Sequence, residues 1–254
     1  MRLKIKDECF LRYLVRMLKA GVLSDGELRR TEEGSPQGNV ASPVLSNVYA
    51  HYVLDTWFED VVKNHVYGEV ELYRYCDDIV ICCEYDTDAE RIMKALKGRL
   101  VKYGLEMNAE KSRIVRFDKR NGVKKENRET FDFLGFTFYL GKSKTKTLIP
   151  QVRTSRKRLR SKLQNINQWC KETRNRSKLK DLWNILRSKL RGHIQYYSIS
   201  FNLPHVRIFV IKAVRIFFKW MNRRSQRKSF NWCKFNQFIG KNPLPEVKVC
   251  FSLF

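Results

Sequence analysis

The sequence is short of acidic residues, and the shortage is confined to its second half. Residues 151–254 contain 25 lysines and arginines but only 3 aspartates and glutamates, a net charge of +22. Residues 1–150 are nearly neutral, with a net charge of +3. So dense a positive charge repels itself unless a polyanion screens it. The imbalance therefore predicts that the second half binds nucleic acid.

Patterns for metal-binding cysteines and for disulfides are also scarce. The seven cysteines form no Cys-x-x-Cys pair and the four histidines are scattered, which argues against a zinc site. Irregularly spaced cysteines in odd number predict free thiols in a reducing, intracellular setting, either bacterial cytoplasm or an organelle. The sequence shows no signal peptide and no apolar run long enough to span a bilayer, so we expect no membrane partner.

The sequence does contain two adjacent carboxylates, Asp77 and Asp78, between apolar flanks. Residues 71–83 read ELYRYCDDIVICC, in which aromatic and β-branched residues predict two strands with the aspartates at their turn. At a tight turn both carboxylates can face one cation, and hard oxygen ligands suit Mg²⁺, with Mn²⁺ as an alternative. Two such ions can hold the attacking and leaving oxygens of a phosphoryl transfer. Taken alone, most such pairs are ordinary turns and nothing more, so the case for a metal site depends on the surrounding motifs.

Apolar residues at helical spacing predict most of the helices. They indicate helices over residues 4–20, 43–62, 153–172, 178–197 and 204–223, and a short one around 232–238. A further helix is expected from a capping box, Thr87 and Glu90, to Gly104.

Strand signals are fewer and lie in the first half. Residues 131–140 predict a strand with Gly135 at a bulge or a close approach, and residues 105–115 predict two short extended pieces. The expected fold class is α+β. An antiparallel sheet with packed helices over residues 1–150 precedes a basic, all-α bundle over residues 151–254.

Two further features depend on their context. Residues 34–43 (GSPQGNVASP) fix an unusual backbone path, in which Gly38 permits close approach of a ligand, although a plain loop before a helix has the same pattern. Lys111 lies near the aspartate hairpin in the chain order. It is a candidate for contacting a phosphate or donating a proton, and a solvated turn lysine is the alternative.

Five motifs follow one another along the chain: Ser35-Pro36-Gln37-Gly38, SPVLSNVY at 42–49, Tyr75-Cys76-Asp77-Asp78, GLEMNAEK at 104–111, and Phe133-Leu134-Gly135-Phe136. Their order closely resembles the palm of reverse transcriptases encoded by group II introns. The basic half resembles the thumb, or maturase, domain of these proteins through LRGHIQYY at 190–197 and WCKF at 232–235. The resemblance implies a partial polymerase palm over residues 1–150 and a helical thumb over residues 151–254.

The resemblance also implies a role for each motif. Asp77 and Asp78 would bind the catalytic metal ions, and Lys111 would aid the departure of pyrophosphate. The residues beside the template and the incoming nucleotide would be Ser35, Pro36, Gln37, Gly38, Tyr75 and Cys76. The residues that position the primer would be Phe133, Leu134, Gly135 and Phe136. Cys76 stands where alanine is more common in this family.

The function implied is RNA-directed DNA synthesis, with intron RNA or another RNA template, a DNA primer and dNTPs as partners. The family holds its metals with a third aspartate from an upstream motif, which has no counterpart here, since Asp7 lies in a basic amphipathic segment. We therefore expect the carboxyl-terminal part of a polymerase core, with a second polypeptide supplying the fingers and the first aspartate. The alternatives are an RNA-binding module that assists splicing, or an inactive fragment.

Overall fold

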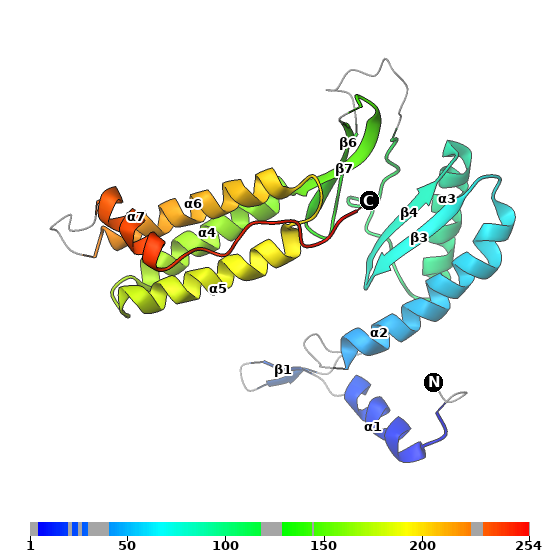
Figure 1. Ribbon diagram of the computed structural model, residues 1–254. Coiled ribbons are helices and arrows are strands. Elements are labelled where there is room, and N and C mark those ends of the chain that lie inside the picture. The colour runs from blue at the N-terminus through cyan, green and yellow to red at the C-terminus, as the bar shows by residue number, and fades with distance from the viewer. Residues whose placement is uncertain are drawn as a thin grey trace. The chain divides into compact units, whose positions relative to one another are not determined.

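The computed structural model describes residues 5–19, 22–24, 27–29, 41–117, 129–143, 145–224 and 231–253 (Figure 1). It forms two compact units, Met1–Ile114 and Val115–Phe254. The boundary falls before the sheet of residues 131–154 because this sheet packs with the helices that follow it. The division into palm and thumb at residue 150 is a functional prediction, and these units do not coincide with it.

The first unit is built on one hairpin and two long helical segments. After helix α1 (Glu8–Lys19) and the small hairpin β1 (Val22–Ser24) and β2 (Glu27–Arg29), α2 (Ser42–Ala50) begins with Pro43 in its first turn. Helical structure continues without a break to residue 65. Its later segments are η1 (His51–Asp55), η2 (Phe58–Val62) and η3 (Lys63–His65). The helix predicted for residues 43–62 is confirmed.

Strands β3 (Val70–Tyr75) and β4 (Asp78–Cys83) form the antiparallel hairpin, and α3 (Asp86–Lys102) follows. Apolar side chains of the hairpin pack against both helical segments. Two clusters make this core, the first around Val53, Leu54, Leu96 and Leu100, the second around Phe58, Val62, Val70 and Ile92. The hairpin is thereby held on one face by helices and its turn is left at the surface.

The two ends of α3 differ in how well the sequence predicts them. At its carboxyl end Gly104 has φ +65, and the N–H groups of Gly104 and Leu105 donate to Val101 and Leu100, as in a Schellman motif. The prediction of a capping box at Thr87 was wrong. Tyr85 is the residue before the first turn, and no side-chain hydrogen bond caps the helix. Instead, the buried carboxylate of Asp88 accepts the N–H groups of Tyr67 and Gly68, both at 3.0 Å.

No strand forms in residues 105–117, so the two extended pieces predicted there are not strands. A turn at residues 108–112 does form. The side chain of Asn108 accepts the backbone N–H of Glu110 at 3.1 Å and of Lys111 at 3.2 Å.

The second unit joins a three-stranded antiparallel sheet to four helices. The strands are β5 (Phe131–Phe133), β6 (Phe136–Lys142) and β7 (Leu148–Thr154), in the order β5-β6-β7. The single strand predicted for residues 131–140 is two strands, because Leu134 and Gly135 form a tight turn. Strand β7 was not predicted; it contains Pro150, which an edge strand tolerates.

Helices α4 (Arg156–Thr173), α5 (Leu179–Tyr197) and α6 (Leu203–Met221) confirm the three long helices predicted from periodicity, and α7 (Trp232–Lys241) confirms the short one. Their core contains several aromatic residues, including the fully buried Trp183, Phe217 and Phe235. Buried Asn202 links bundle and sheet, since its side chain accepts the N–H of Thr154 at 2.6 Å and donates to the carbonyl of Tyr197 at 2.7 Å.

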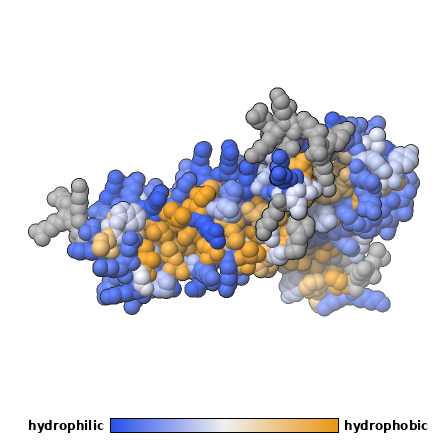
Figure 2. All heavy atoms as spheres, turned by 45° about the horizontal axis from the view of Figure 1, so that its top comes forward, coloured by the Kyte–Doolittle hydropathy of each residue, from blue (hydrophilic) through white to orange (hydrophobic). Residues whose placement is uncertain are grey.

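On the face shown in Figure 2, hydrophobic side chains cover much of the middle of this bundle and hydrophilic side chains line its edges. Across the part of the chain that the structure describes, no helix has the length and hydropathy needed to cross a membrane.

Candidate functional site

The two aspartates lie at the tip of the β3–β4 hairpin. Tyr75 pairs with Asp78, so Cys76 and Asp77 form a two-residue turn and Asp78 begins β4. Cys76 has φ 55, the left-handed conformation needed at the first central position of such a turn. The side chains of Tyr75, Cys76, Asp77 and Asp78 are all exposed. The hairpin therefore presents two adjacent carboxylates to solvent, as the sequence predicted.

The donor set of this turn fits part of a Mg²⁺ site. The carboxylates of Asp77 and Asp78 form no hydrogen bond and no ion pair with another described residue. In proteins Mg²⁺ is coordinated by carboxylate oxygens of this kind, and water and substrate phosphate complete its coordination. Within the described ranges no group of three or more His, Cys, Asp or Glu side chains is placed to hold a metal ion. The described residues therefore show no complete protein-made metal site, and the two carboxylates would be only part of one.

Arg74, the residue before Tyr75, fixes the turn to the helix behind it. Its Nε and Nη2 donate to the two carboxylate oxygens of Asp55, at 2.7 and 2.6 Å. Its Nη1 donates to Oδ1 of Asn47 at 2.7 Å and to the carbonyl of Cys76 at 3.2 Å. We call Asn47, Asp55 and Arg74 the clamp. It joins two turns of helix, the end of strand β3 and the backbone of the turn between β3 and β4.

The electrostatics of the clamp agree with its geometry. The hydrogen bonds from Arg74 hold the pKa of Asp55 below its usual range, and those to Asp55 raise the pKa of Arg74. Both groups therefore stay charged. Sequence reasoning missed the clamp because Asp55 and Arg74 are 19 residues apart. The only available signal was a single arginine within an apolar strand.

The second predicted motif, Phe133 to Phe136, also lies at a hairpin turn. Leu134 has φ 49 and Gly135 φ 82, as in a type I′ turn between β5 and β6. The hydroxyl of Tyr196 donates to the carbonyl of Leu134 at 2.9 Å. A Cβ at Gly135 would lie 2.7 Å from the hydroxyl oxygen of Tyr197, which explains the glycine. The close approach predicted for Gly135 is present, and the bulge is a turn instead.

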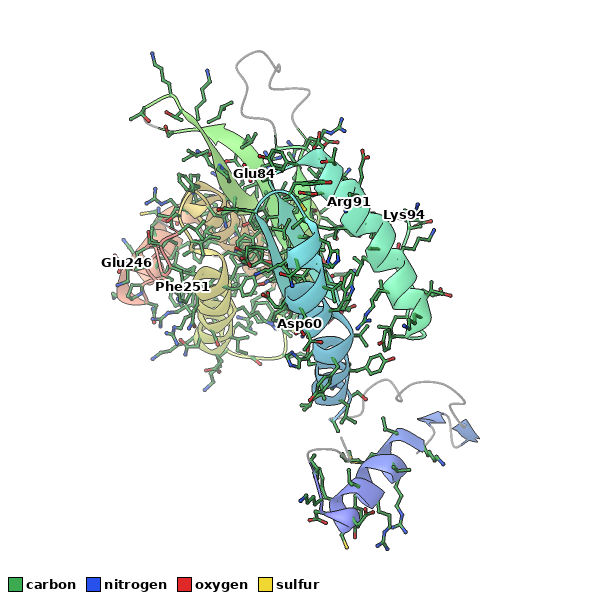
Figure 3. The ribbon with its side chains drawn as sticks, turned by 90° about the vertical axis from the view of Figure 1, so that its right-hand side faces the viewer. Asp60, Glu84, Arg91, Lys94, Glu246 and Phe251 are labelled. Carbon is green, nitrogen blue, oxygen red and sulfur yellow. The ribbon has the colours of Figure 1, made fainter. Side chains whose placement is uncertain are left out.

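A mostly apolar cavity of about 660 Å³ lies beside this turn. Its lining includes Phe133, Leu134 and Phe136, together with Phe251 and Leu253 of the carboxyl-terminal segment. That segment is held by backbone bonds, since the N–H of Cys250 donates to the carbonyl of Ser198 at 2.7 Å. Phe251 is labelled in Figure 3. Sequence reasoning gave this segment no role, because a short apolar tail carries no signal of its own.

The first turn of α4 concentrates positive charge near the same hairpin. Arg156, Lys157 and Arg158 are exposed there, although the positive end of a helix dipole disfavours cations. Ser155 donates to Asp132 at 3.1 Å and does not cap the helix. One turn later, burial and the charge of Arg158 lower the pKa of Lys162. An anion at this surface would relieve each of these unfavourable features.

The remaining predicted residues lie apart from these contacts or outside the described ranges. Lys111 is exposed in the turn formed by Asn108, and no contact joins it to Asp77 or Asp78 among the described residues. Lys94 of α3, another cation of this unit, projects into solvent (Figure 3). Ser35, Pro36, Gln37 and Gly38 lie outside the described residues, so their roles stay predictions.

Comparison with known proteins assigns the class. Residues 2–138 match the family described as reverse transcriptase (RNA-dependent DNA polymerase). This match covers more than half of the chain, which therefore belongs to the reverse transcriptase family. The α+β fold, with small antiparallel sheets and a helical second half, is consistent with a partial palm followed by a helical domain.

Two curated relatives come from introns. The chain is 43% identical over 49 residues to the group II intron-encoded protein LtrA of Lactococcus lactis subsp. cremoris, which is 19% of this chain and 8% of LtrA. It is 36% identical over 64 residues to an uncharacterised 91 kDa protein in the cob intron of Schizosaccharomyces pombe, 25% of this chain and 8% of that protein. The resemblance to group II intron proteins is confirmed. The matched stretches span only 8% of either relative's length.

Proposed function

We propose that the chain takes part in RNA-directed DNA synthesis of the group II intron type, with Asp77 and Asp78 as its metal-binding carboxylates. The observation that carries this proposal is the exposed pair of carboxylates on a turn that the clamp fixes, in a chain of the reverse transcriptase family. A bound Mg²⁺ or Mn²⁺ would act as a Lewis acid on the primer 3′-hydroxyl and on the nucleotide phosphates.

The other residues of the motifs take positioning roles in this proposal. Tyr75 and Cys76 lie against the primer end and the incoming nucleotide, and Lys111 serves the departing pyrophosphate. The turn at Leu134 and Gly135, with Phe133 and Phe136 on either side, positions the primer. Holding reactants in line contributes much of the rate of such a transfer. The template and nucleotide contacts assigned to Ser35, Pro36, Gln37 and Gly38 belong to the same proposal.

The test is extension of a DNA primer on an RNA template with Mg²⁺ or Mn²⁺. The purified chain is used alone and with a polypeptide that carries the upstream part of a group II reverse transcriptase. We expect synthesis that Asp77→Asn with Asp78→Asn reduces by at least about 100-fold, as for loss of a main electrostatic contributor. The matched control is Glu59→Gln with Asp60→Asn, a second exposed acidic pair in the same unit. Equal synthesis by the aspartate variant contradicts the metal assignment.

A second candidate, an RNA-binding module that assists intron splicing, is favoured by the charge of the second half. Absence of synthesis in both conditions, with tight RNA binding that weakens steeply as salt rises, supports this module over the polymerase. The comparisons give no support to a second polypeptide partner. All seven cysteines are unpaired, which agrees with the reducing, cytoplasmic setting that we infer.

A further inference from the structure

We propose that Arg74 is a positioning residue for Asp77 and Asp78, and that it acts through the clamp that it forms with Asn47 and Asp55. This inference rests on the proposed function, because it assumes that the two carboxylates bind the catalytic metal. It gives a role to three residues, of which only Asn47 lies in one of the five motifs, and that motif was given no role in the site.

The first argument is the geometry of the guanidinium. Arg74 is paired with both oxygens of Asp55 at 2.7 and 2.6 Å, and its third nitrogen reaches Asn47 at 2.7 Å. Bidentate pairing of this kind fixes a planar group in orientation as well as in position. The side chain of Arg74 is only 12% exposed, so little room remains for another arrangement. A lysine at this position keeps the charge and loses the fork.

The second argument is what the fixed guanidinium does to the turn. Its Nη1 donates at 3.2 Å to the carbonyl of Cys76, and Asn47 Nδ2 contacts Sγ of the same residue at 3.8 Å. Cys76 is held in the left-handed conformation, φ 55, which a residue other than glycine keeps only where its surroundings impose it. Asp77 and Asp78 follow directly. The clamp therefore holds the peptide that joins Cys76 to Asp77, directly before the two carboxylates.

The chain offers a matched control at the other end of the same hairpin. Lys63 forms ion pairs with Glu59 at 3.0 Å and with Glu71 at 3.1 Å, and so also joins the helix to strand β3. Glu71 pairs with Cys82, at the end of the hairpin far from the turn. Glu71→Gln therefore removes a more exposed helix-to-strand ion pair of the same hairpin and leaves the turn intact.

The first measurement is Mn²⁺ binding, followed by electron paramagnetic resonance. The site is defined as the binding that Asp77→Asn with Asp78→Asn removes. We expect Arg74→Lys and Asp55→Asn to weaken this binding by about tenfold or more, the range found for groups that orient metal ligands. Asn47→Ala, the mildest change, is expected to act in the same direction, and Glu71→Gln to bind as the unaltered chain does. Unchanged affinity in Arg74→Lys overturns the proposal.

The second measurement does not depend on metal or on activity. Cys76 and Cys250 are alkylated with iodoacetamide, and peptide mass spectrometry measures the rate at each. The comparison is between the thiol in the β3–β4 turn and an exposed thiol in the other unit. We expect the clamp variants to change the rate at Cys76 several-fold and to leave the rate at Cys250 unchanged. An unchanged rate at Cys76 shows that the turn does not need the clamp and overturns the proposal.

The two measurements separate this inference from the proposed function. If Asp77→Asn with Asp78→Asn leaves Mn²⁺ binding unchanged, the metal assignment is contradicted. The alkylation rate at Cys76 still decides whether the clamp holds the turn. A loss of affinity in Arg74→Lys without any DNA synthesis supports the clamp and contradicts only the polymerase.

Discussion

Cys76 and Leu134, two of the four described residues other than glycine that have a positive φ, lie at the tips of the β3–β4 and β5–β6 hairpins. Each conformation costs about 1–3 kcal/mol and persists only where its surroundings impose it. Arg74 donates to the carbonyl of Cys76, and Tyr196 donates to the carbonyl of Leu134. Both turns coincide with motifs of the family, so we infer that the strain maintains a functional geometry.

Gly135 allows a test of the second turn by stability. Gly135→Ala places a methyl group 2.7 Å from the Tyr197 hydroxyl at φ +82, so we expect a loss of about 1–3 kcal/mol in the free energy of unfolding. The control is Gly192→Ala in α5, where a Cβ meets no atom within 4 Å. A helical alanine in its place should stabilise by about 0.5–1 kcal/mol. Urea unfolding measures both, and equal effects of one sign would contradict the account of the turn.

His193 gives a prediction for pH. It is buried against Phe209 and Tyr197, and burial, with a smaller effect of Lys162, lowers its pKa to about 3. Below pH 6.5 the unfolded chain binds a proton that the folded chain does not. Stability is therefore full above that pH and falls as pH drops toward 3, by up to about 1.4 kcal/mol per unit.

The measurement compares urea unfolding at pH 7.5 and 5.5. We expect the unaltered chain to lose about 1 kcal/mol more than His193→Phe, which keeps the stacking. Burial also lowers the pKa of His205, which contributes equally to both proteins and cancels in the comparison. A His193 ring signal that titrates near pH 6.5 in nuclear magnetic resonance would show that the ring is not buried as described.

At the scale of elements, helix α4 begins with three cations where its dipole disfavours them. Replacing Arg156, Lys157 and Arg158 by glutamine should leave the bundle as stable as before or stabilise it by about 1 kcal/mol. The same change should weaken RNA binding and reduce its salt slope by about 2. Weaker RNA binding without a loss of stability would show that these charges serve ligand binding and not folding.

The control removes the same charge from the other end of the bundle, as Lys171→Gln, Lys234→Gln and Lys241→Gln. All three lysines are exposed. Filter binding over a range of salt measures the slopes. A slope that falls equally in both variants would contradict a specific role for the start of α4.

The elements also show what sequence reasoning can reach. Helices were predicted well because apolar periodicity is local, and Gly104 gave the end of α3 because its positive φ is a local requirement. The hairpin β5–β6 was missed because leucine is a poor turn residue and Tyr196 holds the turn from 62 residues away. The start of α3 was predicted wrongly because no side chain caps it, and Asp88 instead accepts the N–H groups of Tyr67 and Gly68, 21 and 20 residues away in the chain. Long-range contacts explain both features that the sequence did not predict.

At the scale of the whole molecule, the charge asymmetry and the carboxylate pair were both evident from sequence. The residues that hold the two hairpin turns were not evident, because the clamp and the tyrosines of α5 contact these turns only in the folded chain. The compact units divide at Ile114 and Val115, and the change in charge comes later, near residue 150. The sheet of residues 131–154 packs with the helices after it and so belongs to the second unit, whereas the excess positive charge begins only with those helices.

The central claim is that one chain separates a carboxylate turn for DNA synthesis from a basic bundle for RNA. The direct test measures primer extension and RNA affinity on the same preparations of three proteins. These are the unaltered chain, Asp77→Asn with Asp78→Asn, and the triple glutamine variant of α4. We predict that the aspartate variant loses synthesis and keeps its RNA affinity and salt slope, whereas the α4 variant loses affinity and slope. Loss of RNA affinity in the aspartate variant, or synthesis that survives it, would contradict this separation.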